Sequence, residues 1–86
     1  MIDVDIRRMI VRALKESNVY AIGDEALQES FVAGARDVAL ADLAIDSLAQ
    51  MELCIAIESE TGAVIVPGDL EKIGSLEGLV RAIGAA

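Results

Sequence analysis

The pattern of apolar and polar positions predicts that this chain is helical. In residues 2–16 the apolar side chains recur every three or four positions, as on one face of a helix: Ile6, Ile10, Ala13 and Leu14. The basic residues of the segment fall on its other faces: Arg7, Arg8, Arg12 and Lys15. We therefore expect a first helix here, with Arg7 among its polar positions.

Residues 47–61 have the strongest helical pattern, and Gly62 ends it. The apolar positions form two neighbouring stripes, one of Leu53, Ala56, Ile57 and Ala49, the other of Leu48, Met51 and Ile55. This apolar surface is wider than one buried face needs. Part of it is therefore expected to be shared with a ligand or a partner.

The C-terminal third predicts two further helices. Three of the residues 63–66 are β-branched, but they have no other strand to pair with, so we interpret the segment as an extended linker. Pro67 can open a short helix through Glu71, because the first helical position needs no N–H. Ser75 then caps a last helix that ends near Gly84.

Residues 19–43 are less regular and are interpreted as a long connecting loop. Gly23 and Gly34 interrupt the pattern, with a short helical turn between them at 24–30. A loop this long has a function or packs apolar groups of its own. The candidate anchors are Phe31, Val32, Val38 and Leu40.

Composition limits the size and partners of the protein. The chain of 86 residues is long enough for a single domain, residues 1–86, with one modest core. Its net charge of −8 opposes binding to nucleic acid or to an anionic membrane surface. The charge fits docking onto basic patches of larger proteins, but on charge alone solubility is the preferred reason for it.

The rare residues exclude several kinds of chemistry. Without histidine there is no Ser-His-Asp triad, and with a single cysteine, Cys54, there is no usual zinc site. Cys54 cannot form an internal disulfide and is interpreted as a small buried hydrophobe. The acidic N-terminal segment and the lack of a long apolar run predict a cytoplasmic protein without a membrane span.

The segment that leads into the helix at 47–61 has a distinctive sequence. Residues 42–48 read Asp-Leu-Ala-Ile-Asp-Ser-Leu, and related features continue through Met51-Glu52-Leu53, Pro67, Leu70 and the stretch 73–80. Over residues 42–83 the chain resembles the family of acyl and peptidyl carrier proteins. Two features depart from that family: the loop at 19–41 is longer than usual, and Ala44 stands where many members have glycine.

The resemblance implies a fold and a cofactor. The fold is all-α, a four-helix bundle of acyl-carrier-protein type with a long loop between its first two helices. Ser47 would receive 4′-phosphopantetheine from coenzyme A, through a transferase that uses magnesium, and Asp46 would help that transferase recognise the site. A phosphodiester at this place would gain from the free N–H groups and positive dipole end of a helix N-terminus.

Ser47 and Asp46 also have a purely structural interpretation. Ser47, with Gln50 three residues later, fits a capping box before an apolar run. A carboxylate such as that of Asp46 is favoured at any helix N-terminus. These interpretations stay open beside the attachment site, and both can hold in the unmodified protein.

The resemblance further implies docking residues on the helix at 47–61: Leu48, Met51, Glu52, Ile55 and Glu58. Core packing of the apolar residues and simple solvation of the glutamates are the alternatives. The Asp-Ser-Leu form is more typical of acyl than of peptidyl carriers. Ala49 and Ser59 are uncharged where fatty-acid carriers are often acidic, which favours polyketide or mixed polyketide/nonribosomal peptide biosynthesis.

The resulting hypothesis is a discrete, monomeric acyl carrier protein that is not itself an enzyme. It would present thioester-linked intermediates to acyl- or aminoacyl-loading, condensing and tailoring enzymes. A fatty-acid or an aminoacyl (peptidyl) carrier is the alternative within the family. Outside it, the alternatives are a cofactor-free helical interaction module and a small enzyme with an unmodified Ser47 nucleophile and Lys72 as a distant candidate base.

Overall fold

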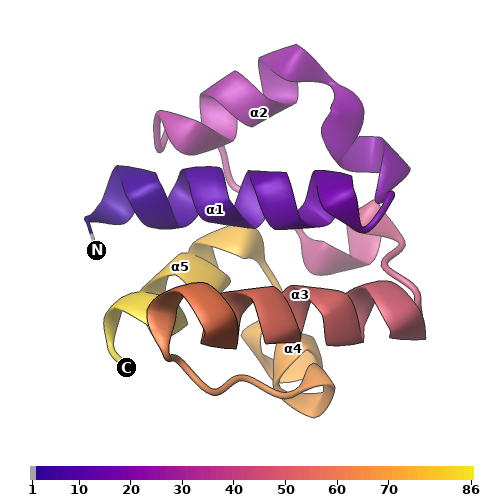
Figure 1. The fold of residues 1–86 in the computed structure, drawn as a ribbon. Helices are drawn as coiled ribbons and strands as arrows, with labels where there is room; N and C mark the ends of the chain where they lie inside the picture. The colour runs from indigo at the N-terminus through magenta and orange to yellow at the C-terminus, as the bar shows by residue number, and fades with distance from the viewer. Residues whose placement is uncertain (1) are drawn as a thin grey trace.

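A computed structural model describes residues 2–86, which are all helical apart from their connections (Figure 1). The described part has five α-helices and two 3₁₀ helices: α1 (Asp3–Glu16), η1 (Tyr20–Gly23), α2 (Glu25–Val32), η2 (Leu40–Leu43), α3 (Ser47–Thr61), α4 (Pro67–Ile73) and α5 (Leu76–Gly84). The all-α prediction is confirmed, with five α-helices where the sequence pattern predicted four. The additional helix is α2.

Helix α1 lies at the centre of the bundle. It packs against α2 on one side and against α3 and α5 on the other, and Figure 1 shows it running between α2 and α3. Its apolar face enters a core to which α2, α3, α5 and η1 also contribute. The largest side chains that are fully buried there are Phe31, Ile10, Leu14, Ile22, Leu53, Ile57, Leu76 and Leu79.

The segment at 19–43 is more ordered than the predicted loop. Helix α2 begins after Asp24, whose side chain accepts a hydrogen bond from the Ala26 N–H at 2.9 Å, and it runs two residues beyond the predicted turn. Phe31 explains the extension, because its fully buried ring needs the last turn of α2 to reach the core. Of the other predicted anchors, Val38 is buried and Val32 and Leu40 are half-buried.

Arg7 does not lie on a polar face of α1 as the pattern predicted. Its side chain is only 7% exposed. The guanidinium donates to the carboxylate of Asp3 at 2.7 Å, to the carbonyl of Phe31 at 2.9 Å and to the carboxylate of Glu77 at 2.6 Å. A cation can be buried only where acceptors compensate for its lost hydration, and α2 and α5 supply them here.

The C-terminal third follows the prediction closely. Residues 63–66 belong to no helix and no strand, and α4 begins at Pro67. The Ser75 hydroxyl accepts the Gly78 N–H at 3.1 Å and caps α5. One isolated antiparallel bridge, Ala39 with Ser75, fastens the segment before η2 to the start of α5. None of the helices within residues 2–86 is long and apolar enough to cross a membrane.

Candidate functional site

Ser47 is the first residue of α3, and its side chain is exposed. The residue that caps this helix is Asp46, whose carboxylate accepts the Ala49 N–H at 2.8 Å. The predicted capping box of Ser47 and Gln50 is therefore wrong: the Gln50 amide instead donates to the carbonyl of Ile45 at 3.1 Å. Asp46 performs the capping more strongly because a carboxylate is charged, and this leaves the Ser47 hydroxyl free.

The first turn of α3 has backbone N–H groups that form no hydrogen bond within the described residues. The Ala49 N–H is bound by Asp46, and the Gln50 N–H reaches the Asp46 carbonyl at 2.9 Å. Within residues 2–86, the backbone N–H groups of Ser47 and Leu48 and the Ser47 hydroxyl form no hydrogen bond. Two free N–H groups at the positive end of a 15-residue helix make this turn a favourable place for a phosphate bonded to the Ser47 oxygen.

The turn before Ser47 places a non-glycine residue in the left-handed region. Ala44 has φ 50° and ψ 46°, just after η2. This conformation reverses the chain so that Leu43 enters the core while Asp46 and Ser47 face solvent. The departure seen in the sequence, alanine where many members of the resembled family have glycine, thus falls on a position where glycine is the unstrained residue.

Two hollows flank this turn. One, of about 390 Å³, lies between η2, the start of α3 and α4, and its apolar wall includes Leu40, Ile45 and Leu70. The other, of about 260 Å³, lies between η1 and the turn, and Asp42 and Asp46 line it together with Tyr20. Tyr20 is 97% exposed. Sequence reasoning missed it, although an aromatic residue in a chain that has only two is a usable signal.

The outward face of α3 displays the residues that the resemblance implied for docking. Leu48, Met51 and Ile55 are 67%, 55% and 63% exposed. Their spacing of three and four residues puts them in one row, and the exposed Glu52 and Glu58 lie along the same side. The structure thus excludes core packing for these three apolar residues. We call the five residues the α3 face.

The opposite side of α3 belongs to the core. Ala49, Leu53, Cys54 and Ile57 are buried there. Burial raises the pKa of the Cys54 thiol, and the nearby carboxylate of Asp69 raises it further. A thiol in that environment is a poor nucleophile. Because Ala49 is buried, its lack of charge says nothing about docking.

Among the described residues, Ser47 has neither a bonded side-chain base nor a metal-binding cluster beside it. An unmodified serine nucleophile needs a hydrogen-bonded base, and within residues 2–86 no side chain binds the Ser47 hydroxyl. The described residues also contain no cluster of three or more side chains suited to hold a metal ion. What the geometry offers is an accessible hydroxyl on a rigid helix end, beside a row of exposed apolar side chains.

The comparison with protein families gives one match. The family model described as phosphopantetheine attachment site matches residues 25–83, about two thirds of the chain. The match begins at α2 and includes both the turn at Ala44 and the α3 face. No curated protein and no solved structure matches the chain.

Proposed function

Because the chain belongs to the phosphopantetheine attachment site family, we propose that it works as an acyl carrier protein with its cofactor on Ser47. The domain is a site of covalent 4′-phosphopantetheine attachment, so the chain is a phosphopantetheine-carrying carrier protein. Such a carrier interacts with a phosphopantetheinyl transferase and with biosynthetic enzymes. The choice of serine, the docking surface and the pathway are the parts that we propose.

The free hydroxyl of Ser47 at the start of α3 is the observation that supports this choice. The matched range contains four serines: Ser30, Ser47, Ser59 and Ser75. Ser75 uses its hydroxyl to cap α5, and Ser30 is half-buried in α2. Ser59 is exposed but lies in the last turn of α3, where the helix dipole is negative and repels a phosphate. Only Ser47 combines exposure with a helix N-terminus.

Each residue around Ser47 has a definite part in this proposal. The hydroxyl oxygen forms the bond to phosphorus as the nucleotide part of coenzyme A leaves, and its proton passes to the transferase. The N–H groups of Ser47 and Leu48 then stabilise the phosphodiester charge. Asp46 stabilises the turn through the hydrogen bond that its carboxylate accepts from the Ala49 N–H. The terminal thiol of the cofactor supplies the thioester chemistry when it is bound.

We propose the α3 face as the docking surface for the transferase and for the loading, condensing and tailoring enzymes. Leu48 and Met51 begin this row next to Ser47, so a partner that covers them also reaches the attached arm. Glu52 and Glu58 add charge that suits a basic partner surface. The area is small, which fits a carrier that must leave each enzyme quickly.

For the pathway we propose polyketide or mixed polyketide/nonribosomal peptide biosynthesis, with a fatty-acid or peptidyl carrier as the alternative. Of the two uncharged positions that favoured this choice, Ala49 drops out because it is buried. The exposed Ser59 remains. Loading assays with malonyl, long-chain acyl and aminoacyl donors distinguish the three pathways.

Intact-mass measurement tests the attachment site. The protein is incubated with coenzyme A, magnesium and a broad-specificity phosphopantetheinyl transferase, beside the variants Ser47→Ala and Ser59→Ala. We expect a gain of about 340 Da, the mass of one phosphopantetheine, in the wild type and in Ser59→Ala, and none in Ser47→Ala. Modification of Ser47→Ala would place the cofactor on another residue and overturn the choice of Ser47. Modification of no folded form, with two different transferases, would favour a cofactor-free interaction module.

A further inference from the structure

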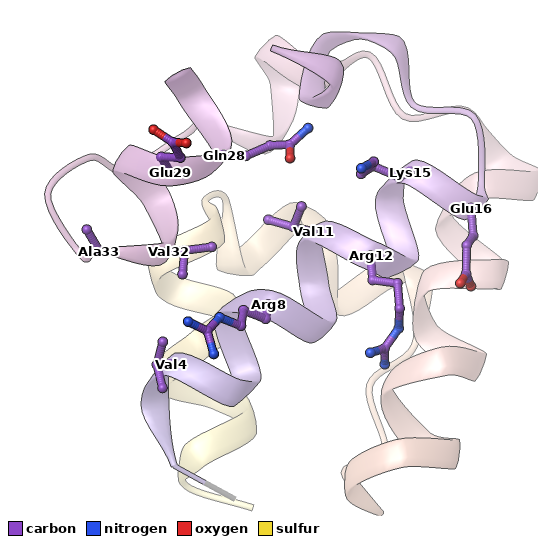
Figure 2. A pocket seen from close by; sticks show the side chains of 10 residues that line it. All are labelled: Val4, Arg8, Val11, Arg12, Lys15, Glu16, Gln28, Glu29, Val32 and Ala33. Atoms are coloured by element: carbon purple, nitrogen blue, oxygen red, sulfur yellow. The ribbon is translucent and has the colours of Figure 1, made fainter. Parts of the chain in front are cut away.

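A further hollow lies away from Ser47, between α1 and α2. It is an open groove of about 800 Å³ (Figure 2). Val4, Arg8, Val11 and Lys15 follow one another along α1 at spacings of four, three and four residues, so they form one stripe on that helix. Helix α2 contributes Gln28 and Val32, one turn apart, to the facing wall. We call this the α1–α2 groove.

Charged side chains of both signs line the groove: Arg8, Arg12, Lys15, Glu16 and Glu29. Figure 2 shows Arg8 below Val32 and the carboxylate of Glu29 directed away from α1. Arg12 lies on the other edge of α1, where it forms an ion pair with Glu60 of α3. Arg8 and Lys15 therefore stand on either side of Val11 as an apolar and basic strip.

This strip differs in sign from the rest of the molecule. Of the four basic residues of α1, Arg7 is buried and paired with Asp3 and Glu77, and Arg12 is paired with Glu60. Arg8 and Lys15 are exposed and are the cations that remain for the strip. The whole chain has a net charge of −8, and α3 has three glutamates and no basic residue. A partner attracted to the α1–α2 groove must therefore have charge opposite to that of a partner attracted to the α3 face.

The shape of the groove favours a helix as its occupant. The groove is open along its length, so a small ligand in it would keep much of its surface in water, unlike ligands in enclosed pockets. Helix α1 is 14 residues long, about 21 Å at 1.5 Å per residue. A helix of about four turns could lie along it with apolar residues on the half-buried Val4 and Val32 and acidic residues on Arg8 and Lys15.

From this complementarity we propose that the α1–α2 groove docks an acidic amphipathic helix of a partner protein, separately from the α3 face. A second copy of the chain is a poorer occupant, because each copy has a net charge of −8 and the two repel one another. An anionic membrane is opposed by the same charge. The proposal does not depend on the cofactor, because none of the groove residues takes part in the attachment site.

Two designed helical peptides of 14 residues test the proposal. Both have leucines in one stripe, and the remaining positions are glutamate in the first and lysine in the second. Amide chemical shifts of the ¹⁵N-labelled protein show where each peptide binds. We expect the acidic peptide to shift α1 and α2, more strongly at low salt, and the basic peptide to shift the α3 face.

Matched charge reversals give the control. In Arg8→Glu/Lys15→Glu the affinity for the acidic peptide should fall at least about tenfold, because two attractions become repulsions. Arg36→Glu/Lys72→Glu makes the same change in net charge at exposed positions outside the groove and should lower it much less. Val32→Ser should also weaken binding, with thermal melting to show that the variant is folded.

Several outcomes would overturn the proposal. They are equal binding of both peptides to the groove, shifts from the acidic peptide that lie outside α1 and α2, or an equal loss in the two double variants. Binding of phosphatidylserine vesicles to the groove, without binding of the acidic peptide, would identify a membrane surface instead. A failure at the groove with normal modification of Ser47 leaves the carrier function intact.

Discussion

The α3 face and the α1–α2 groove are both partly apolar surfaces, but the chain builds them in different ways. The α3 face and the turn before it rest on local contacts: Asp46 caps the helix three residues away, and the exposed row follows from helical spacing alone. The groove needs contacts between distant segments. Arg7 joins α1 to Phe31 in α2 and to Glu77 in α5, which are 24 and 70 positions away in the chain.

Because of this difference, the α1–α2 groove can change without a change at the start of α3. The start of α3 can keep its geometry as long as its own turn is intact. The position of α2 depends on a buried cation and its acceptors, with the Arg7 guanidinium 5.2 Å from the centre of the Phe31 ring. A single substitution should therefore loosen the groove and leave the attachment site usable.

Arg7→Ala is the change with the largest expected effect. It leaves the partly buried Glu77 carboxylate without its partner and removes one of the two hydrogen bonds that the Phe31 carbonyl accepts, the other coming from the Gly34 N–H. Breaking such a buried pair costs about 3 kcal/mol of the free energy of unfolding. Urea denaturation measures the loss. Hydrogen exchange should show that α2 loses protection first, while a transferase still modifies Ser47.

The neighbouring cation provides the control for this prediction. Arg8 is exposed, so Arg8→Ala should change the free energy of unfolding by less than about 0.5 kcal/mol. Equal effects of the two substitutions would mean that Arg7 is not held as the structure shows. Equal loss of protection in α2 and α3 would contradict the separation of the two regions.

The sequence predicted the α3 side well because its determinants are close together. Helical spacing, Gly62 after the last turn, Pro67 at the start of α4 and Ser75 before α5 act over a few residues, and each stands where it was expected. The capping residue was displaced by one, from Ser47 to Asp46. Both residue types cap helices, and only the backbone conformation shows which one does.

The α1–α2 side could not be predicted in the same way. A hydrophobicity pattern places Arg7 among polar positions, because it depends only on nearby residues and the acceptors of Arg7 on α2 and α5 are distant in sequence. Helix α2 is only eight residues long and its apolar pattern is weak, so its stability comes from Phe31 in the core rather than from local propensity. The groove follows from both features and is therefore invisible in the sequence.

Ala44→Gly should act on the α3 side alone and in the opposite direction. Glycine removes the left-handed strain of Ala44, an amount partly offset by its greater freedom in the unfolded chain. The net result should be about 0.5–1 kcal/mol of added stability. Ala41→Gly, in the adjacent η2 at negative φ, should instead destabilise by a similar amount. A loss of stability in Ala44→Gly would show that the turn does not adopt this conformation.

The smallest expected effect is a pH-dependent loss of stability on substitution of Asp37, which connects the segment after α2 to α5. Burial opposes ionisation of Asp37, but its carboxylate accepts the N–H groups of Val38 and Glu77 at 2.7 and 2.9 Å, and these bonds hold its pKa below the usual range.

A lowered pKa in the folded protein means that the stabilisation is complete above the unfolded value of about 4 and is lost as the pH falls through the folded value. Asp37→Asn should therefore cost more stability at pH 7 than at pH 3, as measured by urea denaturation at the two pH values. Because Asp37 joins the segment after α2 to α5, the cost should appear as faster exchange in α2 with no change in the modification of Ser47. An equal loss of stability at both pH values would mean that the carboxylate charge of Asp37 does not stabilise this connection to α5.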